Sequence, residues 1–238
     1  MLGKLLKIGL LIWMALVIVG AFLYAPPAAG FRVPELARLL FFHVPNAMAA
    51  TCASVASAWY ALRYLMAHNL RADIKSHAAS GLAMLFWLLT TITGAVFAKV
   101  QWGAYWNWDP KQSAIFVLLL IYMAYFALRS AVPDPRKAAA ISAGYALFAA
   151  ATVPFLTYVL PNAPGVQSLH PQGVVFSEDG MDARYKLIFW SATVGFLGLA
   201  LWIFRLQVRV EEMRLDLRLR PVSPRTASAP ALAGGTKP

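Results

Sequence analysis

Six long apolar segments run through this sequence, and they constrain the fold more than any other feature. Each has about 20 residues, the length of helix that crosses a hydrocarbon layer of roughly 30 Å. A chain inside lipid must satisfy its own backbone hydrogen bonds, and no segment alternates as a barrel strand does, so we expect helices. The segments lie at about 5–25, 44–66, 77–98, 113–129, 138–160 and 185–206. The predicted fold class is all-α, an integral membrane bundle of six transmembrane helices.

Composition and the first apolar segment agree with this prediction. Hydrophobic residues make up 60% of the chain and charged residues only 13%, against roughly a quarter charged in a soluble domain. The first segment follows Lys4 and Lys7 and resembles a signal peptide in that respect. Its apolar run from Leu5 to Ala25 is longer than the roughly 7–15 residues of a signal sequence. We therefore expect a retained first helix.

The basic residues predict the orientation of the chain. With the N-terminus in the cytoplasm, 15 of the 21 Lys and Arg residues fall on the inner side, as the positive-inside rule requires. Both termini are then cytoplasmic. The net charge of +11 reflects this topology and attraction to the lipid bilayer, and indicates no nucleic-acid partner. The outer side holds Arg32, Arg38, Lys99, Lys111, Arg184 and Lys186.

Two parts of the chain are expected. Residues 1–206 form the six-helix membrane domain, and residues 207–238 form a basic juxtamembrane helix extension followed by a disordered cytoplasmic tail. The single cysteine, Cys52, lies among small residues of the second apolar segment. We interpret it as a packing residue, because a lone cysteine forms no internal disulfide.

The outer loop at about 99–112 has an unusual density of aromatic residues. Such a loop can serve as an interfacial aromatic belt or as a flat platform for a large planar ligand, and composition leaves both readings open. The acid that closes the cluster, Asp109, precedes a proline and can N-cap the next helix. The residues concerned are Trp102, Gly103, Tyr105, Trp106, Trp108 and Asp109.

Histidines supply a second pattern. His68 and His77 fall at the cytoplasmic loop between the second and third segments, where a solvated or packing role is the default. His43 lies at the outer end of the second segment and His170 in the last outer loop, so both share a face with the tryptophan loop. Imidazole is a common axial ligand of haem iron. Two imidazoles beside several indoles make a haem site with His43 and His170 as axial ligands plausible.

These motifs resemble a known family. Trp102-Gly103-x-x-Trp106-x-Trp108-Asp109 is similar to the tryptophan-rich signature of the haem-handling cytochrome c assembly proteins. The short chain and the contexts Phe42-His43-Val44-Pro45 and Leu169-His170 resemble the maturation protein C (haem exporter protein C) branch over about residues 5–206. The resemblance implies that the tryptophan loop contacts haem on the outer face and that His43 and His170 bind the iron.

The same resemblance implies a function. The protein would bind haem b at the outer face of the cytoplasmic (inner) membrane and deliver it to a periplasmic haem chaperone, maturation protein E. Further partners would be the ATP-binding-cassette maturation proteins A and B and the small membrane protein D. No P-loop motif occurs in the sequence, and we expect no enzyme, although assistance to haem attachment is compatible with the site. Arg38, Lys99, Lys111 and Arg184 are candidate contacts for the haem propionates.

Other functions stay open at this point. A b-type electron-transfer cytochrome would hold haem between histidines on facing helices, often in more than one pair. A substrate transporter would carry charges inside its spans, and these six contain almost none. Asp109-Pro110-Lys111 also resembles the other cytochrome c assembly branches, but their chains have many more helices or an additional large soluble domain.

Overall fold

The computed structural model describes residues 2–170 and 181–219. Its α-helices are α1 (Leu2–Val19), α2 (Leu40–Ala67), α3 (Leu70–Trp102), α4 (Pro110–Ala131), α5 (Pro135–Pro154) and α6 (Ala183–Leu219). Short turns of π- or 3₁₀-helix join them: η1 (Gly20–Tyr24), η2 (Pro34–Leu39), η3 (Phe155–Val159) and η4 (Leu160–Asn162). Within the described residues, six helical segments are long and apolar enough to cross a membrane. The predicted all-α fold with six spans is confirmed.

Capping residues set the helix ends. The side chain of Asn69 accepts a hydrogen bond from the backbone N–H of Arg71 at 2.9 Å and begins α3. Asp134 caps α5 in the same way, with a proline at the first helical position, where its missing N–H costs nothing. His68 ends α2 in the left-handed conformation, with φ of 51°. Residues 68–69 alone therefore connect α2 to α3.

This short connection corrects one prediction. The sequence places His77 at the edge of the loop, as the first residue of the third span, but it lies about two turns inside α3, which begins at Leu70. Its Nδ1 is 3.3 Å from the hydroxyl of Tyr125 on α4. The apolar run is shorter than α3, because a helix extends beyond its membrane-spanning part until a capping residue ends it.

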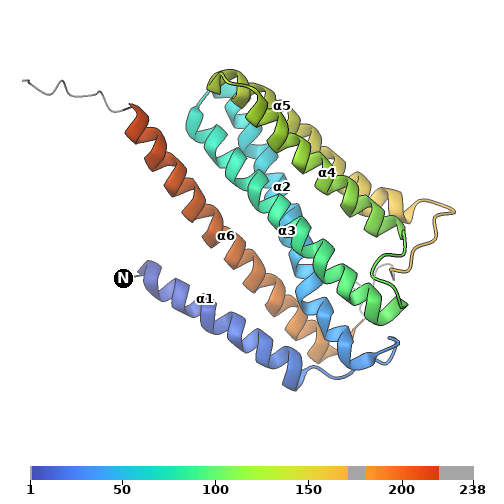
Figure 1. Ribbon diagram of the computed structural model, residues 1–238. Helices are drawn as coiled ribbons and strands as arrows, with labels where there is room; N and C mark the ends of the chain where they lie inside the picture. Colours follow the sequence, from blue (N-terminus) through green and yellow to red (C-terminus); the bar gives the residue numbers. More distant parts are fainter. Residues whose placement is uncertain (1, 171–180, 220–238) are drawn as a thin grey trace, which may run out of the picture.

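Helix α2 occupies the centre of the bundle. It packs against α3, α5 and α6, and α1 lies along α6 at the side of the bundle (Figure 1). Alanines at positions 49, 50 and 53 of α2 meet Leu82 and Phe86 of α3 in one buried cluster. Small residues let two helices approach closely, which is how helices without a hydrophobic driving force associate in lipid.

A set of buried polar contacts joins α2, α3 and α4. The Tyr122 hydroxyl donates to Ser54 Oγ at 2.7 Å, and the guanidinium of Arg129 donates to both carboxylate oxygens of Asp73 at 2.8 and 2.6 Å. This ion pair lies at the end of the bundle opposite the tryptophan loop. The sequence predicted almost no charged residues inside the spans. The Asp73–Arg129 pair agrees with this prediction, because it lies near the start of α3 and the end of α4.

We expect Asp73→Ala to lower stability by about 3–5 kcal/mol, because it leaves the Arg129 guanidinium buried without its carboxylate. The matched control is Asp216→Ala, which removes the exposed Asp216–Arg71 pair and should cost less than about 1 kcal/mol. Thermal unfolding of both variants in detergent measures the difference. Equal melting temperatures for the two variants would show that the buried pair does not stabilise the bundle.

The connections that carry the predicted site residues meet at one end of the bundle (Figure 1). The Gln101 side chain bonds both to the backbone N–H and to the backbone carbonyl of Val33, at 3.2 and 3.0 Å, which ties the first connection to α3. Asp109 bonds to residues 168–170 of the third connection. At the other terminus, α6 continues as one helix to Leu219, and the predicted tail beyond it lies outside the described residues.

Candidate functional site

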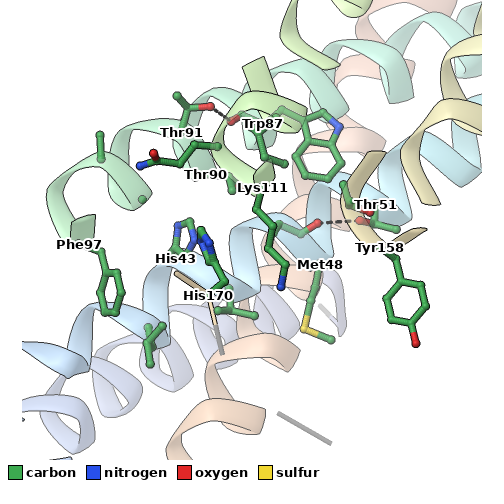
Figure 2. Close-up of a pocket in the computed structure, with 18 of the residues that line it drawn as sticks. His43, Met48, Thr51, Trp87, Thr90, Thr91, Phe97, Lys111, Tyr158 and His170 are labelled. Carbon is green, nitrogen blue, oxygen red and sulfur yellow. Dashed lines mark hydrogen bonds between the residues drawn. The ribbon is translucent and has the colours of Figure 1, made fainter. Parts of the chain in front are cut away.

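A largely apolar cavity of about 520 Å³ opens at this end of the bundle, a volume typical of small-molecule sites. On α2 its wall runs from Leu40 to Cys52, which corresponds to about 18 Å along the helix at roughly 1.5 Å per residue. The cavity therefore extends deep between the helices. Its lining includes His43, Met48, Thr51, Trp87, Thr90, Thr91, Phe97, Lys111, Tyr158 and His170 (Figure 2).

His43 enters the cavity from the first turns of α2. Its Nδ1 lies 3.2 Å from Thr93 Oγ1 on α3, and that hydroxyl already donates to the backbone carbonyl of Leu89 at 2.7 Å. Since the hydroxyl proton is committed, Nδ1 of His43 is the donor in this contact and Nε2 carries the free lone pair. The ring also stacks parallel to Phe97, with an interplanar angle of 5°. His43 is thus held from two sides, by Thr93 and by Phe97.

His170 enters the same cavity from the third connection (Figure 2). Its Nδ1 is 2.8 Å from Oδ1 of Asp109, whose side chain is 0% exposed. The other carboxylate oxygen accepts from Ser168 Oγ at 2.9 Å and from the Leu169 backbone N–H at 2.6 Å. Trp102 meets the His170 ring edge-on, with centroids 4.8 Å apart. Both predicted axial histidines therefore face one cavity, each secured through Nδ1.

The Asp109 carboxylate is charged in this arrangement. Burial acts to raise its pKa, but the hydrogen bonds from His170 and from the Leu169 backbone outweigh burial and hold the pKa well below its usual range. The same carboxylate accepts from the Lys111 backbone N–H at 2.9 Å and so N-caps α4. Asp109 is not among the cavity-lining residues of the described chain.

The four candidate propionate contacts separate into two groups. Lys99 donates to the Gly103 carbonyl at 3.1 Å, Arg38 donates to the Ala25 carbonyl at 3.2 Å, and Arg184 pairs with Asp182. Lys111 instead extends its ammonium group into the cavity near His170 (Figure 2). Among the described residues, none is hydrogen-bonded to that ammonium. Lys111 is therefore the cation placed to meet an acidic group of a ligand.

The tryptophan loop is shorter than the sequence predicted, because α3 continues to Trp102. Trp102 and Trp106 line the cavity, whereas Trp108 is 77% exposed and Tyr105 60% exposed. Gly103 ends α3 with φ of 90°, a left-handed conformation that favours glycine. Gly103 therefore reverses the chain direction, and only the first two tryptophans border the cavity.

Comparison with known protein families shows to which family this chain belongs. The model of the family described as Heme exporter protein C matches residues 1–224. The chain belongs to this family. The match includes all six spans and every residue of the candidate site, and it confirms the resemblance drawn from the tryptophan loop and the two histidines.

Individual members of the Heme exporter protein C family give the same result. The protein of that name from Paracoccus denitrificans is 29% identical over 197 residues, which cover 78% of this chain and 80% of the relative. The one from Rhodobacter capsulatus is 28% identical over 206 residues, covering 83% and 82%. The one from Bradyrhizobium diazoefficiens is 31% identical over 121 residues, covering 51% and 46%.

Several residues that build the site in this family member were not found by sequence reasoning. A Cβ at Gly94 would lie 2.7 Å from Cε1 of His43, so only glycine leaves room for the imidazole. Thr93 orients the same ring. Gln112 accepts from the Asn107 backbone N–H at 2.9 Å and holds the tryptophan loop. A glycine inside a long apolar helix was the one signal in the sequence that pointed to such close approach.

Proposed function

We propose that this protein binds haem b at the outer face of the cytoplasmic membrane and delivers it to a periplasmic haem chaperone during biogenesis of c-type cytochromes. The observation that carries the proposal is the pair His43 and His170, which line one apolar cavity while the Nδ1 atom of each contacts a neighbouring side chain. Neutral imidazole is a common axial ligand of haem iron. The names of the relatives, Heme exporter protein C, support the same cargo.

The cavity residues fit haem as cargo. Its apolar walls suit a planar macrocycle, Trp102 and Trp106 supply aromatic faces, and Lys111 supplies one cation for a propionate. When bound, haem brings the iron and the reactive vinyl groups. This chain's residues ligate, orient and exclude water, and we assign them no catalytic step. Membership of the family supports the expected partners, the chaperone and the maturation proteins A, B and D.

The experiment that tests this function follows haem from one protein to the other. The purified protein loaded with haem should give a six-coordinate, low-spin absorption spectrum, and mixing with the apo form of the chaperone should move haem to the chaperone. A b-type electron-transfer cytochrome would instead keep its haem through cycles of reduction and oxidation. Haem that stays bound after addition of the chaperone would reject delivery, and a five-coordinate spectrum would reject the histidine pair.

The orientation of the chain is tested separately by labelling. In a Cys52→Ala background, cysteines at Tyr105 and Leu169 should react with a membrane-impermeant maleimide in intact spheroplasts. A cysteine at Arg218 near the end of α6 should react only after lysis, because the positive-inside rule places it in the cytoplasm. All three side chains are exposed, so a difference in labelling reports only the side of the membrane on which each cysteine lies. The opposite labelling pattern would place the cavity on the cytoplasmic side.

The tryptophans should not contribute equally. Trp102→Leu and Trp106→Leu remove aromatic surface from the cavity and should weaken haem retention, each by about 0.5–1.5 kcal/mol or roughly 2- to 13-fold. Trp108→Leu should have the smallest effect of the three, since its ring is mostly exposed. The control is Trp59→Leu, an exposed ring of α2 outside the cavity. Haem titration of the purified variants measures the order, and unchanged haem retention in all three would favour a simple aromatic belt.

A further inference from the structure

The Asp109 carboxylate has four hydrogen-bond donors although its side chain is fully buried. Oδ1 accepts from the Lys111 backbone N–H and from His170 Nδ1, at 2.9 and 2.8 Å. Oδ2 accepts from Ser168 Oγ and from the Leu169 backbone N–H, at 2.9 and 2.6 Å. The donors come from two segments some 60 residues apart. One side chain thus fastens the start of α4 to the segment that carries His170.

This arrangement fixes the protonation pattern of His170. An ionised carboxylate accepts hydrogen bonds only, so the proton between Asp109 and His170 must be on Nδ1 of the imidazole. In the neutral form of the ring, Nε2 then carries the lone pair. Because Ser168 and Leu169 are bound to the same carboxylate, the backbone that presents the ring is held as well.

We propose that Asp109 is a positioning residue, which holds His170 as the Nδ1–H tautomer and presents Nε2 to the cavity as a ligand atom. The statement that Nε2 binds haem iron rests on the proposed function, whereas the statement about the tautomer is independent of it. The sequence grouped Asp109 with the haem-contacting loop, whereas its carboxylate contacts the 168–170 segment. A carboxylate bonded to an imidazole makes it a stronger ligand, and removing such a partner typically costs 10- to 100-fold in metal affinity.

Asparagine cannot replace Asp109 in this role. Its side chain has one acceptor oxygen and an NH₂ group that would face either the Leu169 N–H or the His170 Nδ1–H. The matched control is Asp134, which also N-caps a helix but accepts both of its bonds on Oδ1 alone. Asparagine serves equally well there. Asp109→Asn and Asp134→Asn are therefore the same substitution at two helix caps, only one of which holds a histidine.

The first measurement uses haem-free protein labelled with ¹⁵N-histidine, by NMR at mildly alkaline pH. His170 should appear as the Nδ1–H tautomer in the wild type and in Asp134→Ala, and should lose that preference in Asp109→Ala, where no side-chain acceptor is left beside Nδ1. An Nε2–H tautomer in the wild type overturns the proposal whether or not any variant folds. An unchanged Nδ1–H tautomer in Asp109→Ala overturns it too.

The second measurement uses haem-loaded protein. Asp109→Asn should retain haem about 10- to 100-fold less tightly, and its remaining haem should have a more positive reduction potential, because a weaker donor stabilises the ferric iron less. Asp134→Asn should match the wild type in both. Unchanged retention and potential in Asp109→Asn would reject the positioning role. If the wild type itself shows no histidine-ligated haem, the proposed function fails, while the tautomer still decides the role of Asp109.

Discussion

Replacement of either His43 or His170 by alanine is expected to convert the bound haem from six-coordinate, low-spin to five-coordinate, high-spin. Each substitution removes one of the two imidazole rings that line the cavity. Loss of a partner outside the ligand shell already costs 10- to 100-fold in affinity, so loss of a ligand should weaken haem retention by at least about 100-fold. Absorption spectra and haem content of the purified variants measure both effects.

The control for this pair is His68→Asn. His68 lies at the opposite end of the bundle, and asparagine also tolerates its left-handed backbone, with φ of 51°. The variant should keep the wild-type spectrum. His77 is a poorer control, because it contacts Tyr125 within the helix bundle. A low-spin spectrum retained by both alanine variants would place the iron elsewhere, and added imidazole that restores the spectrum of the His170 variant would confirm the lost ligand.

The sequence predicted the helices well because each depends on a local property. A span is recognised from the length of its apolar run. The start of a helix depends instead on its cap, which for α3 is Asn69. The apolar run of the third span begins at residue 77, several residues after α3 itself, so a boundary drawn from hydropathy left Asp73 outside α3 and put His77 at its edge.

The site was predictable as a list of residue types but not as a set of contacts. The orientation rule put His43, His170 and the tryptophans on one face, and the structure brings both histidines, Trp102 and Trp106 to one cavity. What each loop residue does depends on backbone conformation: Trp108 has a positive φ of 55° and is exposed. The hydrogen bonds of Asp109 to residues 168–170 join segments about 60 residues apart in the sequence. Contacts between segments so far apart cannot be predicted from residue spacing.

Gly94 illustrates the same limit and carries the last prediction. It is a glycine in the middle of α3, where alanine normally stabilises a helix by about 0.5–1 kcal/mol. Here an alanine Cβ would lie 2.7 Å from Cε1 and 3.2 Å from Nδ1 of His43, closer than non-bonded atoms approach. The imidazole must then move and lose its bond to Thr93. Gly94→Ala should therefore show the high-spin spectrum and haem loss of His43→Ala, although no ligand has been removed.

Gly81→Ala is the matched control for this substitution. Gly81 lies in the same helix, and its nearest contact for a new Cβ is Phe126 Cζ at 3.9 Å, an ordinary van der Waals distance. Both variants should reach wild-type protein levels, because alanine favours the helix at either position. If Gly94→Ala keeps the low-spin spectrum, the present orientation of the His43 ring is not required for ligation of the iron. A spectral change in Gly94→Ala but not in Gly81→Ala would show that His43 can bind iron only when the space beside its ring is left open by a glycine.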